Sequence, residues 1–197
     1  MPRTPGKPVR ILFQQVTQAS IRKAMASSAD ATSGGGARDL RLRPDDKVRP
    51  FMERLLPQSR SQVRRGRNGA ADENLIIHFG TVTWGDGTEE REIEYWPPTN
   101  ARIGEGRIAR ISSLPPLQNP PTTIEGAVVL FVEDVNGVIW VRYATADGLR
   151  QSLREISDLI RLCLASAEGT RLATGYIDYS AGEMDTWCNA DVDESEE

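Results

Sequence analysis

The stretch GAVVLFVEDVNGVIWVRYAT, residues 126–145, indicates the fold class. Apolar residues run from Gly126 to Val132 and again from Val138 to Thr145, and Asn136-Gly137 lies between the two runs. An Asn-Gly pair between apolar, β-branched segments is the strongest short-range signal for a β-hairpin. The stretch therefore predicts two antiparallel strands joined by a tight turn.

A second hairpin is predicted upstream. Residues 75–84 are apolar and β-branched, residues 85–87 (Gly-Asp-Gly) form a turn signal, and residues 90–96 alternate Ile93 with charged neighbours. We expect the polar, arginine-rich residues 58–74 to form a loop. Further strands are expected at residues 38–43 and 171–179, and residues 10–24 are expected to be a strand or a short helix. Residues 102–111 are expected to form a basic loop that leads into a short strand.

Two helices are predicted. Residues 44–56 place Val48, Met52, Leu55 and Leu56 on one face, and Pro57 ends this helix. A longer helix starts near Leu149 and is capped by Asp147. Its apolar residues recur at Leu153, Ile156, Ile160, Cys163 or Leu164, and Ala167, and Gly169 ends it. About seven strands and two helices predict a mainly β protein, a mixed barrel with helices at its ends. Residues 1–8 are expected to be a disordered basic tail, residues 9–180 the folded domain, and residues 181–197 an acidic tail.

Charge is distributed unevenly along the 197 residues. Residues 1–70 contain 15 Lys and Arg against 5 Asp and Glu, whereas residues 71–197 contain 9 against 23. Among the 24 basic residues only Lys7, Lys23 and Lys47 are lysines. The planar guanidinium of arginine suits bidentate recognition of phosphates and of guanine edges, so the basic half is a candidate nucleic-acid surface. A GC-rich genome explains the preference for arginine equally well, but it does not explain the split in charge.

Few residues of the chain suit metal or nucleophilic chemistry. Cys163 and Cys188 are its two cysteines and His78 its one histidine, too few for a zinc cluster, and we expect free thiols in a cytoplasmic protein. No stretch is apolar over the roughly 18 residues that a membrane helix needs. No phosphate-binding loop, HExxH or GxSxG motif occurs, so we expect neither catalysis nor a cofactor. Glu133-Asp134 is expected to be an exposed turn and His78 a structural, hydrogen-bonded residue.

Three stretches in the same order resemble the N-terminal effector-binding domain of the EcoRII-type restriction endonucleases. The first is SADATSGGG, residues 28–36, followed by a strand and a short helix that ends at Pro57. The second is the hairpin DGTEEREIEY, residues 86–95. The third runs from EGRIAR, residues 105–110, through PLQNP, residues 116–120, to the strand around residues 138–141. The resemblance covers roughly residues 15–165.

The resemblance implies a DNA-binding pseudobarrel, similar to plant B3 domains, that grips the major groove with two arms. Residues 22–38 would form the N-arm and residues 102–110 the C-arm. Glu105 and Arg107 would read bases, because a carboxylate accepts from the cytosine amino group and arginine donates twice to guanine. The alternative interpretation of Glu105 and Arg107 is an ordinary exposed salt bridge. The DNA-binding set is Arg22, Lys23, Ser33, Gly34, Gly35, Gly36, Arg38, Arg102, Glu105, Arg107 and Arg110.

The chain also departs from the family pattern. Ala37 stands where the family has a histidine, and Arg102 lies three residues before Glu105 instead of two. About thirty residues follow the long helix, so we expect a stand-alone, sequence-specific reader of double-stranded DNA without a nuclease domain. Its partner could be a separate nuclease or another subunit of a restriction or defence system. Two other classes stay open: a small metal-dependent nuclease that uses Asp72, Glu73, Glu90 and Glu92, and a protein-interaction module whose acidic half binds a basic partner.

Overall fold

The computed structural model describes residues 4–18, 40–42, 48–64, 73–85, 87–96, 105–108, 114–119, 121–122, 126–150, 154–167 and 172–189. At residues 40–42, 64, 73, 74, 93–96, 105 and 107 it describes the backbone. The strands are β1 (Pro8–Gln15), β2 (Leu40–Leu42), β3 (Gln58–Arg64), β4 (Glu73–Trp84), β5 (Gly87–Trp96), β6 (Glu105–Ile108), β7 (Ala127–Asp134), β8 (Ile139–Thr145), β9 (Thr174–Asp178) and β10 (Asp185–Cys188). The helices are α2 (Val48–Leu55), the short α3 (Ala146–Leu149), α4 (Arg154–Ser166) and the 3-10 turn η2 (Pro115–Leu117).

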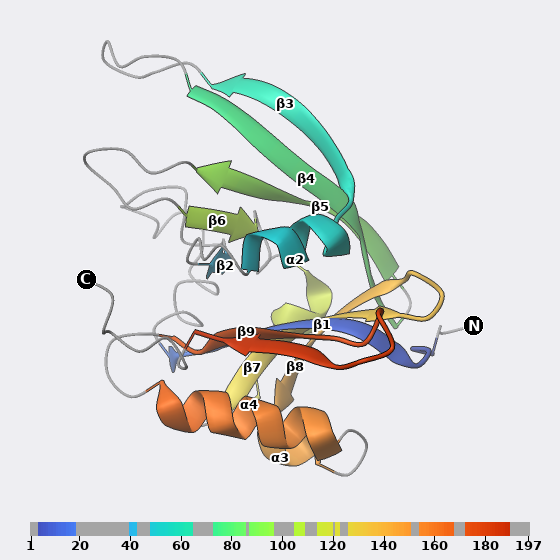
Figure 1. Ribbon diagram of the computed structural model, residues 1–197, viewed down its shortest axis with the longest axis vertical. Coiled ribbons are helices and arrows are strands. Elements are labelled where there is room, and N and C mark those ends of the chain that lie inside the picture. The colour runs from blue at the N-terminus through green and yellow to red at the C-terminus, as the bar shows by residue number, and fades with distance from the viewer. Residues whose placement is uncertain are drawn as a thin grey trace.

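The described strands form one mixed sheet in the order β10-β9-β1-β7-β8-β4-β5-β6-β2, and β3 pairs with β4 outside this path. Neighbouring strands are antiparallel except for β4 and β8, which are parallel over two residue pairs. This short parallel contact divides the sheet into two layers. We call β10, β9, β1, β7 and β8 the lower layer, and β3, β4, β5, β6 and β2 the upper layer, as they appear in Figure 1.

The two layers enclose helix α2, and helices α3 and α4 cover the outer face of the lower layer (Figure 1). Val48, Phe51, Met52 and Leu55 of α2 are buried, at the i, i+3, i+4 and i+7 spacing of one helix face. These side chains belong to a core cluster that also contains Val82 of the upper layer and Phe131 of the lower layer. The cluster therefore holds the two layers together around α2.

Strand β7 is apolar on both faces, as a strand buried between two cores must be. Val129 and Phe131 pack in the cluster around α2, whereas Val128 and Leu130 pack in a second cluster with Ile160 of α4. The hairpin of β7 and β8 is confirmed, and Gly137 of its turn has φ 73°, a left-handed conformation that favours glycine. Strand β7 thus joins the two core clusters through its two faces.

The mainly β fold is confirmed, but the sheet is not closed into a barrel over the described residues. The two halves fold over each other, and the end strands β10 and β2 are not paired with one another in this part of the chain. The loop expected over residues 58–74 is wrong for residues 58–64, which form β3 along the first half of β4. Residues 185–188, within the expected acidic tail, form β10 against β9.

The expectation of free thiols is also wrong, because Cys163 and Cys188 are joined by a disulfide with their Cα atoms 5.9 Å apart. Cys163 lies on the buried face of α4, as its spacing predicted. The bond ties α4 to β10, the last strand of the lower layer. Close packing of β10 is also visible at Gly175 of β9, where a Cβ atom would lie 2.4 Å from the Phe13 ring and 2.5 Å from the Trp187 carbonyl oxygen.

Candidate nucleic-acid interface

Strand β6 carries the part of the predicted DNA-binding set that the structure describes. The backbones of Glu105 and Arg107 lie in this strand, between β5 on one side and β2 on the other. The sequence predicted a basic loop leading into a short strand over residues 102–111, and residues 105–108 of this segment form a strand paired on both sides. The other predicted residues lie outside the described part of the chain: Arg22, Lys23, Ser33, Gly34, Gly35, Gly36, Arg38, Arg102 and Arg110.

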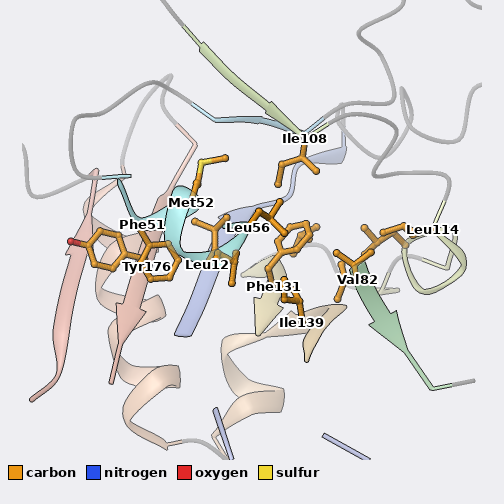
Figure 2. Close-up of a cluster of buried hydrophobic side chains, with 14 of the residues drawn as sticks. Leu12, Phe51, Met52, Leu56, Val82, Ile108, Leu114, Phe131, Ile139 and Tyr176 are labelled. Atoms are coloured by element: carbon orange, nitrogen blue, oxygen red, sulfur yellow. The ribbon is translucent and has the colours of Figure 1, made fainter. Parts of the chain in front are cut away.

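Strand β6 is fixed by the core as well as by its backbone pairing. Ile108, its last residue, is buried in the cluster around α2. Figure 2 shows Ile108 pointing toward Met52 and Leu56 of the α2 region. Because successive residues of a strand alternate between its two faces, positions 105 and 107 lie on the face opposite to that of the buried Ile108. The buried side chain of Ile108 thus anchors the strand that carries the two candidate residues.

The two predicted arms are attached to neighbouring strands. Strand β2 follows the N-arm segment directly, and it pairs with β6 in the register Leu40↔Ile108, Arg41↔Arg107 and Leu42↔Gly106. In the sequence, Arg38 precedes Leu40 by two residues and Arg110 follows Ile108 by two residues. The chain therefore enters β2 from the N-arm at the end of the strand pair at which β6, the centre of the C-arm, reaches its last residue.

Most basic residues of the described N-terminal half are already paired with carboxylates. Arg10 contacts Glu133 at 2.7 Å and Asp178 at 3.4 Å, and Arg54 of α2 contacts the same Asp178 oxygen at 3.3 Å. Burial opposes ionisation of Asp178, but hydrogen bonds from Ser180 and the charges of Arg10 and Arg54 lower its pKa overall. These arginines join the basic and acidic halves of the sequence, so they add little positive charge to a DNA-binding surface.

Arg60 of β3 is paired in the same way. Its guanidinium bonds to Glu92 of β5 and lies over the Phe79 ring of β4, with Cζ 5.3 Å from the ring centroid. Sequence reasoning assigned residues 58–64 to a loop because they show no apolar alternation, and the exposed fractions explain why: residues 58–63 are all exposed. The signal that could have identified the strand is the long apolar β4 beside it, which needs a second neighbour along residues 73–79.

The carboxylates proposed for a nuclease do not gather in the described residues. Glu92 is paired with Arg60, Glu90 is exposed on the same strand, and Asp72 lies outside the described part. Among the described residues no group of three or more His, Cys, Asp or Glu side chains lies close enough to share a metal ion. The described carboxylates thus offer no ready-made metal centre.

Two buried polar residues have structural partners. His78 is buried and hydrogen-bonds through Nδ1 to the Leu56 carbonyl oxygen at 3.2 Å, as its position in an apolar strand predicted. Glu133-Asp134 was expected to be an exposed turn, and this is wrong: Asp134 is 2% exposed. Asp134 accepts hydrogen bonds from the backbone N–H groups of Gly6, Asn136 and Val138 and from the Trp140 indole. Burial raises the pKa of Asp134, but these four donors outweigh it and lower the pKa overall.

No known protein family, curated protein or solved structure matches the chain. Within the described residues, no helix has both the length and the apolar character needed to cross a membrane.

Proposed function

We propose that the protein is a sequence-specific reader of double-stranded DNA that binds the major groove with two arms. Residues 22–38 and 102–110 form these arms, and the sheet with its helices is a B3-like pseudobarrel that presents them. The resemblance to the effector-binding domain of EcoRII-type restriction endonucleases motivates the proposal. The protein reads DNA without cutting it, so a separate nuclease or another defence subunit would have to supply any cleavage.

The pairing of β2 with β6 is the observation that supports the proposal. It anchors the two arm segments to adjacent strands, which lie about 4.8 Å apart in a sheet. Two arms that start from neighbouring strands can reach the same groove, which is about 12 Å wide in B-DNA.

The roles within the arms follow from their chemistry. Arg107 donates two hydrogen bonds to a guanine and Glu105 accepts from a cytosine amino group, so these residues select the sequence. Arg22, Lys23 and the backbone of Gly34, Gly35 and Gly36 hold phosphates, so they add affinity on every sequence. Because several described arginines are neutralised by carboxylates, the arms must supply most of the favourable charge.

Selection of bound duplexes from a random library tests the proposal. We expect one enriched motif, bound about 100-fold more weakly at 200 mM salt than at 50 mM if about four phosphates are contacted. Arg107→Ala should reduce the preference for one base pair by roughly 5- to 100-fold, whereas Arg22→Ala should weaken all sequences alike. The absence of any enriched motif with the wild-type chain would overturn the proposal.

Arg154→Ala is the matched control. Arg154 is an exposed arginine on α4, which covers the far side of the lower layer in Figure 1. The Arg154→Ala variant loses one positive charge, as Arg107→Ala does, but it should leave both the affinity for DNA and the selected motif unchanged. An equal loss in the two variants would indicate that binding depends on net charge alone.

A further inference from the structure

Strand β3 has no neighbour on its outer side in the described part of the chain. It pairs with β4 through consecutive residue pairs without a bulge, from Gln58↔Phe79 to Arg64↔Glu73, and with no other described strand. Figure 1 shows β3 along the outer edge of the upper layer. Residues 58–63 are all exposed, so neither face of the strand is buried there. The backbone N–H and C=O groups on its outer side are therefore a template for another strand.

Proteins usually protect an open sheet edge with a proline, a bulge or charged side chains. Residues 58–64 contain no proline, and their pairing with β4 is regular. Arg60 is the one charged residue among the described side chains of β3, and it is turned inward, away from the open edge. Its guanidinium lies over the Phe79 ring of β4 and bonds to Glu92 of β5. None of these protections is found on the described part of the edge.

One face of the β3–β4 pair also exposes two apolar side chains. Val63 of β3 is 62% exposed, and Ile76 of β4 is 44% exposed. Ser61 lies opposite Ile76, and Val63 is two residues further along β3, so Val63 and Ile76 are diagonal neighbours on the same face. A strand added beside β3 would cover part of Val63, and the loss of exposed apolar surface would favour association.

We propose that β3 pairs in antiparallel orientation with β3 of a second copy of the chain and joins the two upper layers into one continuous sheet. Two identical antiparallel strands are related by a two-fold axis, so one residue faces its own counterpart. A register centred on Ser61 places Arg60 opposite Gln62 of the second copy, so every arginine of the strand faces a neutral residue. A register centred on Arg60 or on Gln62 would place two arginines opposite each other, which destabilises a strand pair. The charge pattern of β3 therefore fits a second copy of β3 in one register.

The proposed contact is small. It involves the 7 residues of β3 in each copy, whereas a standard interface has roughly 20–30 residues a side. We therefore expect a weak, reversible dimer with a dissociation constant on the order of 100 µM. The dimer forms without DNA, so its test is independent of the proposed function.

Sedimentation velocity of the full-length chain, from about 5 µM to about 500 µM, tests the contact. The wild type should shift from the monomer toward twice the monomer mass. Ser61→Lys and Ser61→Glu each place two like charges opposite each other on the axis, so each should weaken association at least about 10-fold. An equimolar mixture of the two variants should associate at least as well as the wild type, because the introduced charges then attract each other. Leu162→Lys is the control: it adds the same charge at an exposed position of α4 and should associate as the wild type does.

A wild type that stays monomeric over the whole range overturns the inference. Ser61 variants that associate as the wild type does, or an equal loss of association in Leu162→Lys, would exclude β3 as the contact. A mixture that stays monomeric, like the two single variants, would overturn the register centred on Ser61. Thermal unfolding of both Ser61 variants should match that of the wild type, because Ser61 is exposed. Recovery of association in the mixture shows separately that both variants are folded.

Discussion

The lower and upper layers of the sheet are built from different kinds of strand. In the lower layer, β7 is buried on both faces, and α4 packs against the layer. A disulfide joins α4 to β10, the last strand of this layer. In the upper layer, β3 is exposed along residues 58–63, and β6 has Ile108 as its contact with the core cluster. Glu105 and Arg107, the candidate positions that the structure describes, belong to the upper layer. The difference suggests that the lower layer contributes most of the stability of the fold. The upper layer is the part that carries the positions proposed to bind DNA.

The largest effect is expected in the core between α4 and the lower layer. Ile160 is 0% exposed, and Ile160→Ala should lower the free energy of unfolding by about 3–4 kcal/mol through lost apolar burial and a residual cavity. Leu162→Ala is the control on the same helix, because Leu162 is 66% exposed and should change stability by less than about 0.5 kcal/mol. Urea denaturation measures both. Similar effects of the two variants would contradict the assigned orientation of α4.

Reduction of the disulfide should have the next largest effect. The bond closes a separation of 25 residues between Cys163 and Cys188, which corresponds to about 3 kcal/mol in the chain-entropy account. We expect the urea midpoint to fall when dithiothreitol is added. The double variant Cys163→Ser/Cys188→Ser should have the low midpoint with and without reductant. Alkylation of both thiols in the unfolded, unreduced protein would show that the bond does not form.

The hydrogen bonds of Asp134 should contribute somewhat less to the free energy of unfolding than the disulfide does. Asp134→Asn replaces one acceptor oxygen by an amide donor, leaving buried N–H groups of Gly6 and Trp140 without an acceptor, at a cost of about 2 kcal/mol. Because the folded-state pKa of Asp134 is lowered, its contribution is present above the unfolded pKa of about 3.9 and is lost as the pH falls toward the folded value.

Stability measured from pH 6 down to pH 2 tests this assignment. The wild type should lose more stability than Asp134→Asn over the acidic part of that range. Asp158→Asn, at an exposed position on α4, is the control and should follow the wild type. Identical pH profiles for the wild type and Asp134→Asn would exclude the hydrogen-bonded carboxylate as the cause.

The smallest effect is expected on the outer strand of the upper layer. Arg60 and Glu92 form a largely exposed ion pair between β3 and β5, with side-chain exposed fractions of 49% and 31%. A double-mutant cycle with Arg60→Ala and Glu92→Ala should give a coupling energy below about 1 kcal/mol, and it should shrink in high salt. A coupling as large as the effect of Ile160→Ala would remove the contrast between the two layers.

Sequence reasoning predicted the elements whose signal is local. The Asn136-Gly137 turn between apolar runs, and the helical spacing of Ile156, Ile160 and Cys163, carry their structure in the residues themselves. Strand β3 (QSRSQVR) carries no such signal, because its strand state comes from pairing with β4 and its side chains are exposed. Which strands pair across long stretches of the chain depends on tertiary packing, and so does the open shape of the sheet. The periodicity of apolar residues does not encode either.

In the candidate site, too, local motifs could be predicted from the sequence, whereas the pairing of strands could not. Motif order placed Glu105 and Arg107 in one arm, a basic loop leading into a short strand, but it did not predict that this strand pairs with β2 and β5. The opposition of Arg41 and Arg107 is a matter of strand register, and no sequence pattern predicts register between strands more than sixty residues apart. The disulfide likewise joins two cysteines whose distance in space the sequence leaves open.

Hydrogen–deuterium exchange of the full chain, with and without the selected duplex, tests most directly whether two arms on adjacent strands bind one duplex. Peptides covering residues 22–38 and peptides covering residues 102–110 should both exchange more slowly in the complex, and peptides from α4 should not change. Slower exchange in only one of the two arms, or slower exchange centred on β9 and β10, would contradict the account.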